Sequence, residues 1–198
     1  MKRILDILIS IFTLLIFGPL ILSLIVIQTM DTKQFGLFRQ MRVGKKGKLF
    51  YVYKIRTMIK DKSITTNITT AKDTRITKNG KFLRKYKFDE LPQFFNVFIG
   101  NMSIVGPRPD VQDFINEINY DERSILLSIK PGITGPGSLE LIDEEEILAN
   151  VVDPHKYNLE IIWPKKLKLI KEYIKNYSII YDLKIIFKTI KLILKKIN

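Results

Sequence analysis

The feature that most constrains this chain is a long apolar run near its start, residues 4–27, interrupted by few polar side chains. A helix needs about 20 mostly apolar residues to cross the hydrocarbon core of a bilayer, so the run predicts a membrane helix. A cleavable signal peptide is the main alternative, and it is disfavoured because no small-residue cleavage site follows the run. We therefore expect a membrane helix over residues 1–30 and a head over residues 31–198.

Basic residues flank the apolar run on both sides, which bears on its topology. Lys2 and Arg3 precede it, and a larger basic group follows it. That group consists of Lys33, Arg39, Arg42, Lys45, Lys46 and Lys48. Basic flanks favour the cytoplasmic side of a membrane, and only a helix that enters, bends and returns keeps both of them there. Gly18-Pro19 supplies a bend, because proline removes a backbone donor and clashes with the preceding turn. From charge and proline alone, this re-entrant topology and an ordinary kinked span are about equally favoured.

The composition narrows the partners that the head can have. The 33 Lys and Arg residues exceed the 20 Asp and Glu residues, which gives a formal net charge of +13 and indicates an anionic partner such as nucleic acid, a phosphorylated substrate or an anionic membrane. Cysteine is absent and His155 is the only histidine, so disulfides and Cys- or multi-His metal sites are excluded. No P-loop, G-x-G-x-x-G, nucleophile elbow or H-E-x-x-H motif is present.

Local patterns predict a mostly α head with little β structure. An alternating, aromatic-rich segment predicts a strand over residues 50–56, and helices are expected over 91–98 and 110–127. Residues 61–81 are predicted to form a polar loop with a turn at Asn79-Gly80, and residues 131–137 a turn-rich loop. The last part of the chain has apolar and lysine residues on opposite faces of a helix, which is typical of a helix in the membrane interface. A core-packing helix with a solvated lysine face is the alternative, and the apolar run near the start favours the interfacial interpretation.

Asp89 and Glu90 form an adjacent pair of carboxylates just before Pro92, at a predicted helix start. The simplest explanation is structural, because acidic residues complement the helix dipole and proline favours the first turn. The functional interpretation is that one carboxylate attacks phosphorus while the other holds a divalent cation. Such a cation should be a hard one, held by carboxylates and phosphates.

Basic side chains surround this pair in the sequence. Lys54 and Arg56 lie on the predicted strand, and Arg108 lies between Pro107 and Pro109. Others come shortly before the carboxylates, namely Arg75, Lys78, Lys81, Arg84, Lys85 and Lys87. Guanidinium groups bind phosphate in a bidentate way. A solvated basic face against anionic lipid would explain many of the lysines, but it explains the restrained Arg108 poorly.

The order and spacing of several segments are specific. These segments are residues 38–44, 53–58, 77 with 80–84, 89–93, 95–97, 101–109, 131–135 and 182–184. Together, and more loosely with residues 2–6, they resemble the bacterial sugar transferase family, the monotopic polyprenyl-phosphate phosphoglycosyl transferases. The resemblance covers nearly the whole chain.

The resemblance implies a fold and an activity. The fold would be a re-entrant membrane helix with its break at Gly18-Pro19, interfacial amphipathic helices and a small cytosolic head, at the bacterial cytoplasmic membrane. The activity would be transfer of a sugar 1-phosphate from a UDP-sugar to polyprenyl (undecaprenyl) phosphate with release of UMP, the first membrane step of surface glycan synthesis. Asp89 would be the nucleophile and Glu90 the ligand of Mg²⁺ or Mn²⁺. The implied substrate-binding residues are Lys54, Arg56, Arg84, Arg108 and Asp182.

Two departures from the family pattern affect these expectations. Many relatives carry a Trp-Ala-Gln-Val-Asn-Gly stretch where this chain has residues 136–140, so the donor sugar stays open. Gly18 stands where some relatives have serine, whose hydroxyl could help satisfy the freed backbone groups at the break. The rival function is that of a membrane-anchored basic protein that binds acidic lipid or nucleic acid without catalysis. For the enzyme we expect no nucleic-acid partner, and the sequence leaves a homodimer, the glycan pathway and the polyprenyl length open.

Overall fold

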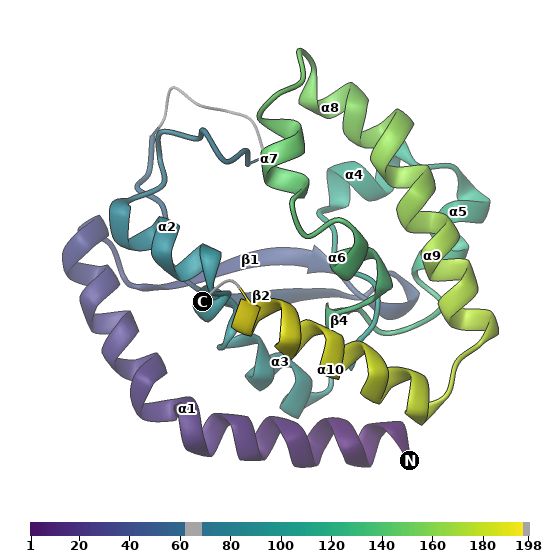
Figure 1. Cartoon of the computed structure of the whole chain (residues 1–198), viewed down its shortest axis with the longest axis horizontal. Coiled ribbons are helices and arrows are strands. Elements are labelled where there is room, and N and C mark those ends of the chain that lie inside the picture. Colours follow the sequence, from purple (N-terminus) through teal and green to yellow (C-terminus); the bar gives the residue numbers. More distant parts are fainter. Residues whose placement is uncertain (62–68, 196–198) are drawn as a thin grey trace.

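Helices make up most of the chain in the computed structural model, which describes residues 1–61 and 69–195 (Figure 1). The helices are α1 (Lys2–Thr32), α2 (Lys78–Lys85), α3 (Gln93–Ile99), α4 (Gln112–Glu117), α5 (Tyr120–Leu126), α6 (Pro136–Glu140), α7 (Glu144–Leu148), α8 (Pro154–Tyr157), α9 (Trp163–Lys175) and α10 (Ile179–Lys195). The strands are β1 (Leu37–Val43), β2 (Leu49–Ile55), β3 (Ser103–Val105) and β4 (Gly132–Thr134). The prediction of a mostly helical chain with little β structure is confirmed.

The apolar run forms α1, the one helix in the described ranges that is long and apolar enough to cross a membrane. Figure 1 shows α1 running along the base of the molecule below α3 and then turning upward beside α2. Pro19 lies inside the helix, and the hydroxyl of Ser23 donates to the Pro19 carbonyl over 3.0 Å. A proline within the helical ladder is a common cause of such a bend.

Polar side chains in the first two turns of α1 fix that helix to the head. The guanidinium of Arg3 donates to two carbonyls in the last turn of α3. The buried carboxylate of Asp6 accepts from the hydroxyl of Ser103 and from the backbone N–H of Ile104, both in β3. A buried carboxylate needs such partners, since an unpaired one would cost several kcal/mol. The apolar helix is thus docked on the head by specific polar contacts.

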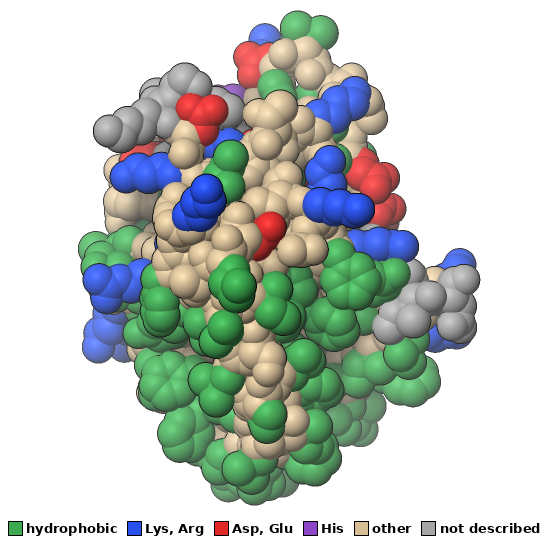
Figure 2. All heavy atoms as spheres, turned by 90° about the vertical axis from the view of Figure 1, so that its left-hand side faces the viewer, with side chains coloured by type: hydrophobic (Ala, Val, Ile, Leu, Met, Phe, Trp, Pro, Cys, Tyr) green, Lys and Arg blue, Asp and Glu red, His purple; other side chains and the backbone are tan. Residues whose placement is uncertain are grey.

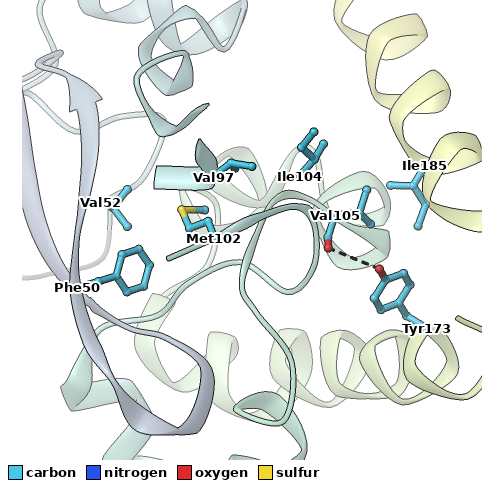
Figure 3. Close-up of a cluster of buried hydrophobic side chains, with 8 residues drawn as sticks. All are labelled: Phe50, Val52, Val97, Met102, Ile104, Val105, Tyr173 and Ile185. Carbon is cyan, nitrogen blue, oxygen red and sulfur yellow. Dashed lines mark hydrogen bonds between the residues drawn. The ribbon is translucent and has the colours of Figure 1, made fainter. Parts of the chain in front are cut away.

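A β-hairpin and a short parallel strand pair support the centre of the head. β1 and β2 pair antiparallel, with Leu37 opposite Ile55, and β3 pairs in parallel with β4. β2 confirms the predicted strand, whereas β1 was not predicted because its polar residues interrupt the apolar pattern. Figure 3 shows the main core cluster, to which β2, α3, β3, α9 and α10 contribute. Its buried members are Phe50, Val52, Val97, Met102, Ile104, Val105, Tyr173 and Ile185.

Three of the predicted elements were wrong in detail. The loop expected over residues 61–81, of which residues 62–68 lie outside the described part, ends earlier than predicted, since Asn79 and Gly80 belong to α2. The helix expected over residues 110–127 is two helices, α4 and α5, because Asn119 begins a new helix by accepting from the N–H of Glu122. Asparagine is a strong helix N-cap. The loop expected over residues 131–137 contains β4 and the start of α6. Pairing with β3 makes a strand of residues that look like a loop in isolation.

The predicted amphipathic helix near the end of the chain is α10, and residues 196–198 lie outside the described part. One side of α10 packs into the core through the buried Ile185 and Asp182. Large apolar side chains on α10 remain exposed, namely Ile180, Leu183, Phe187, Ile190 and Leu194. Figure 2 shows one face of the molecule, where hydrophobic side chains cover the lower part and Lys and Arg lie mostly above and beside them. This separation suits a protein seated in a membrane surface.

Candidate active site

A short turn at the start of α3 holds the two carboxylates. Residues Phe88–Glu90 form a 3₁₀ turn, and Lys87 before it has a positive φ of 58°. The side chains of Phe88 and Leu91 pack against a small buried cluster that includes Leu83. Asp89 and Glu90 lie between these two packed residues in the chain, and both are buried, each with 7% of its surface exposed.

Glu90 is clamped by two of the predicted basic residues. Its Oε1 lies 3.3 Å from Nζ of Lys54 and 3.1 Å from Nη1 of Arg108. These two cations hold the pKa of Glu90 well below its usual range despite burial. Burial lowers the pKa of Lys54, and Glu90 raises that of Arg108. Glu90 is therefore an anion with one oxygen engaged, and no hydrogen bond within the described ranges reaches its Oε2.

Asp89 has a different environment from its neighbour. Its Oδ1 is buried and has no hydrogen-bond partner in the described part of the chain. Burial first, and then the charge of Glu90, raise the pKa of the Asp89 carboxyl to about 6. Unpaired buried carboxylate oxygens are rare and costly. The site thus contains one carboxylate that is held ionised and one that is under-coordinated, which is an arrangement suited to reaction with a substrate or cation.

The unpaired charge of Asp89 gives a prediction about stability. Because the folded-state pKa rises from 3.8 to about 6, ionised Asp89 destabilises the fold by about 3 kcal/mol above that pH. Asp89→Asn should therefore raise the free energy of unfolding at neutral pH. The gain should shrink as the pH falls from about 6 towards 3.8, where the folded protein already carries protonated Asp89. Chemical denaturation of both proteins across this range, without divalent cations, measures the difference, and a variant less stable at neutral pH would contradict it.

α2 presents Arg84 to the same region. The hydroxyl of Thr77 caps α2 by accepting from the N–H of Gly80. Gly80 lies inside the helix and is not the turn predicted there. A Cβ at this position would lie 2.1 Å from the carbonyl oxygen of Thr57, so the close approach of α2 to Thr57 requires glycine. The positive charge of Arg84 opposes the burial that raises the pKa of Asp89. Its guanidinium forms an ion pair with Glu145 of α7.

The two remaining predicted residues lie in other surroundings. Nε of Arg56 donates to the carbonyl of Phe35 over 2.9 Å. Asp182 pairs with Lys2 of α1 at 2.6 Å and accepts a hydrogen bond from Tyr173. The structure therefore brings together Asp89, Glu90, Lys54, Arg84 and Arg108. It places Arg56 beside the start of the hairpin and Asp182 in the contact that joins α10 to α1.

Arg42 and Asp110 belong to the site's electrostatics but were not predicted. Burial lowers the pKa of Arg42 to about 10, against the opposing charge of Asp110. Arg42 donates to the carbonyl of Pro109 over 3.2 Å, directly beside Arg108. Two features of the sequence could have pointed to them. Arg42 lies in one of the family-like segments, and Asp110 comes just after the Pro-Arg-Pro turn. Arg42 helps to hold the turn that presents Arg108 to Glu90.

The residues present fit a hard divalent cation that binds together with a phosphorylated substrate. Groups of three or more potential ligand side chains are absent from residues 1–61 and 69–195, so the chain alone offers the Asp89 and Glu90 carboxylates. Mg²⁺ is commonly held by one or two carboxylates, water and substrate phosphates. The unpaired Oδ1 of Asp89 and the free Oε2 of Glu90 are suitable donors.

A buried carboxylate pair with lysine and arginine against it is an arrangement suited to phosphate chemistry. The chain belongs to the bacterial sugar transferase family, since the family's model matches residues 1–196. This assignment confirms the resemblance inferred from the sequence.

Several relatives carry names of undecaprenyl-phosphate sugar phosphotransferases. The chain is 34% identical, over 98% of its length, to the UDP-N-acetylgalactosamine-undecaprenyl-phosphate N-acetylgalactosaminephosphotransferase of Aeromonas hydrophila, and covers 43% of that protein. It is 36% identical, over 96% of its length, to the UDP-glucose:undecaprenyl-phosphate glucose-1-phosphate transferase of Klebsiella pneumoniae, and covers 39% of it. It is 32% identical, over 98% of its length, to the uncharacterized sugar transferase EpsL of Bacillus subtilis, and covers 87% of it. The chain thus spans less than half of the two named phosphotransferases, whose donor sugars differ.

Proposed function

We propose that this chain transfers a sugar 1-phosphate from a UDP-sugar to a polyprenyl phosphate, with release of UMP, as an early membrane step of bacterial glycan synthesis. The observation that carries the proposal is the buried Asp89–Glu90 pair, in which Oδ1 of Asp89 has no hydrogen-bond partner among the described residues and Glu90 is held by Lys54 and Arg108. The names of the relatives support both substrate classes.

The first step is nucleophilic attack by Asp89. Its carboxylate oxygen forms a bond to the sugar-proximal phosphorus, and the bond from this phosphorus to the bridging oxygen breaks, so UMP leaves with that oxygen. Lys54, Arg84 and Arg108 provide positive charge where the diphosphate would bind. A bound Mg²⁺ or Mn²⁺, held by Glu90, would neutralise charge that develops on the leaving phosphate.

The second step regenerates Asp89. An oxygen of the polyprenyl phosphate bonds to the same phosphorus, and the bond between phosphorus and the Asp89 oxygen breaks. Two steps allow UMP to leave before the lipid phosphate engages. The lipid-linked product is a diphosphate. In each of the two steps the total charge is the same before and after the reaction.

We further propose that α1 is a re-entrant helix that bends at Gly18-Pro19 in the cytoplasmic membrane. The head, residues 31–198, would then lie on the cytosolic face with the exposed apolar side of α10 in the interface. Support comes from the bend in α1 (Figure 1), the polar docking of its first turns on the head, and its exposed apolar surface. The bend needs no long irregular break in the helix, because α1 continues through Pro19.

The topology has a direct test in this cysteine-free chain. One variant carries a cysteine inserted after Met1, which leaves the ion pair of Lys2 intact, and another carries Lys33→Cys at an exposed position. Both cysteines should react with an impermeant maleimide only after the cells are opened. If one of them were labelled in intact spheroplasts, α1 would be a full span.

The function is tested by incubating the membrane-embedded protein with a panel of UDP-sugars and undecaprenyl phosphate and measuring UMP. Release with at least one donor, and a new lipid-linked diphosphate sugar, are expected. The rival function, a membrane-anchored protein that binds acidic lipid or nucleic acid, does not explain a buried carboxylate pair, which would repel phosphates unless a cation intervened. Binding to anionic vesicles with no UMP from any donor would favour the rival.

A further inference from the structure

Arg84 is already occupied by a carboxylate of the chain itself. Its Nη2 lies 2.5 Å from Oε1 of Glu145, the second residue of α7. The Arg84 side chain is 20% exposed, and that of Glu145 is 42% exposed. A carboxylate and a phosphate use the same bidentate face of a guanidinium. Glu145 therefore sits on the group that the proposed function assigns to the donor phosphates.

The neighbouring ion pairs leave little free positive charge for an incoming diphosphate. Lys54 and Arg108 are both engaged by Glu90. Glu144, next to Glu145, pairs with Lys166 at 2.8 Å and also faces Arg108 closely enough to raise its pKa. A diphosphate that entered this site would meet carboxylates as well as cations, unless one of the existing pairs opened.

The pair between Arg84 and Glu145 is the one most able to open. Glu90 has 9% of its side chain exposed and two cationic partners, so breaking its ion pairs would strand a buried carboxylate. Glu145 is more than four times as exposed, and exposed ion pairs contribute little to stability. α7 itself has independent anchors, namely the buried Leu148 and a hydrogen bond from the Ala71 N–H to the Glu145 carbonyl. Only the Glu145 side chain has to rotate.

We propose that Glu145 is an intramolecular competitor of the donor diphosphate for Arg84, and that its side chain leaves Arg84 when the nucleotide binds. This inference rests on the proposed function, because it takes the diphosphate as the ligand of Arg84. In the absence of donor the contact offsets the charge of Arg84, and it weakens binding of the nucleotide. It also makes donor affinity depend on Glu145 of α7.

The test is the affinity for UDP, the part that all UDP-sugars share, measured by isothermal titration calorimetry in the presence of Mg²⁺. Glu145→Gln should bind UDP about threefold more tightly than the wild type, since the competing exposed ion pair is gone. With a reactive UDP-sugar, KM should fall by a similar factor while kcat stays unchanged. The gain should diminish at high salt, which screens the wild-type ion pair.

Glu146→Gln is the matched control, because it removes the same charge from the same helix at an exposed position that forms none of the ion pairs found in the described ranges. It should leave UDP affinity unchanged, so that a general charge effect is separated from the contact with Arg84. Weaker UDP binding by Glu145→Gln would show that Glu145 orients Arg84, and equal binding would show no competition; either result overturns the inference. If the wild type and Glu145→Gln bind UDP with equal affinity, the inference fails but the proposed function survives. If neither binds UDP or releases UMP, the proposed function fails with the inference.

Discussion

Asp89→Asn should reduce UMP release from the reactive UDP-sugar by on the order of 10⁴-fold or more, the range found when a covalent nucleophile is removed. Asparagine has nearly the same volume but no anionic oxygen to attack phosphorus. Because Asp89 is buried and its Oδ1 has no hydrogen-bond partner in residues 1–61 and 69–195, the variant loses no described hydrogen bond at that atom and should remain folded. The loss should appear in kcat, since the charge clamp formed by Lys54 and Arg108 on Glu90 stays in place.

The matched control is Asp121→Asn, which removes an exposed carboxylate from the first turn of α5. It should retain near wild-type turnover. The thermal midpoint of Asp89→Asn should equal or exceed that of the wild type, in line with its predicted stability. If folded Asp89→Asn kept a substantial part of the turnover, Asp89 would be a metal ligand or a structural residue at the helix start, and the lipid phosphate would attack the donor directly.

Glu90→Gln should lower activity roughly 10²–10³-fold, the loss typical of removing one group that stabilises charge in a transition state. The neutral amide is a poor ligand for a hard cation, and it no longer neutralises the buried Lys54. Wild-type activity should disappear in excess EDTA and return with Mg²⁺ or Mn²⁺. Full activity of the wild type in excess EDTA would rule out the metal.

Loss of the Glu90 charge also affects the fold, so a second measurement separates the two effects. Mn²⁺ binding in the presence of UDP, followed by electron paramagnetic resonance, should be weaker in Glu90→Gln than in wild type. Glu122→Gln serves as the control; it removes a carboxylate that accepts a hydrogen bond from Trp163 outside the site. Unchanged Mn²⁺ affinity in a folded Glu90→Gln protein would confine the role of Glu90 to holding Lys54 and Arg108.

The elements predicted correctly are those whose patterns are local. The apolar run, the alternating strand β2 and the amphipathic α10 each carry their periodicity in consecutive residues. The loop expected over residues 131–137 failed because β4 exists only through pairing with β3, about thirty positions earlier. Likewise, Gly80 looks like a turn residue, yet its lack of a side chain serves the close approach of α2 to Thr57.

The predictions of the site residues divide in the same way, into local patterns and tertiary contacts. Asp89 and Glu90 are adjacent, and the Pro-Arg-Pro turn singled out Arg108, so these residues were visible in the sequence. The sequence could not show that Lys54 and Arg108 both bind Glu90, or that Oδ1 of Asp89 has no hydrogen-bond partner within the described part of the chain. Nor could it show that Arg84 meets a carboxylate from a segment far along the chain, because such contacts depend on tertiary packing.

The central claim, that the buried Asp89 takes up the sugar phosphate, has one direct measurement. The protein and a reactive UDP-sugar are mixed with Mg²⁺ and without any lipid acceptor, UMP is counted per protein molecule, and the peptide that contains Asp89 is weighed by mass spectrometry. The account predicts a rapid release of up to one UMP per active site and a sugar-phosphate adduct on that peptide, both absent in Asp89→Asn. Release of UMP only when undecaprenyl phosphate is added, with no adduct at any time, would contradict it.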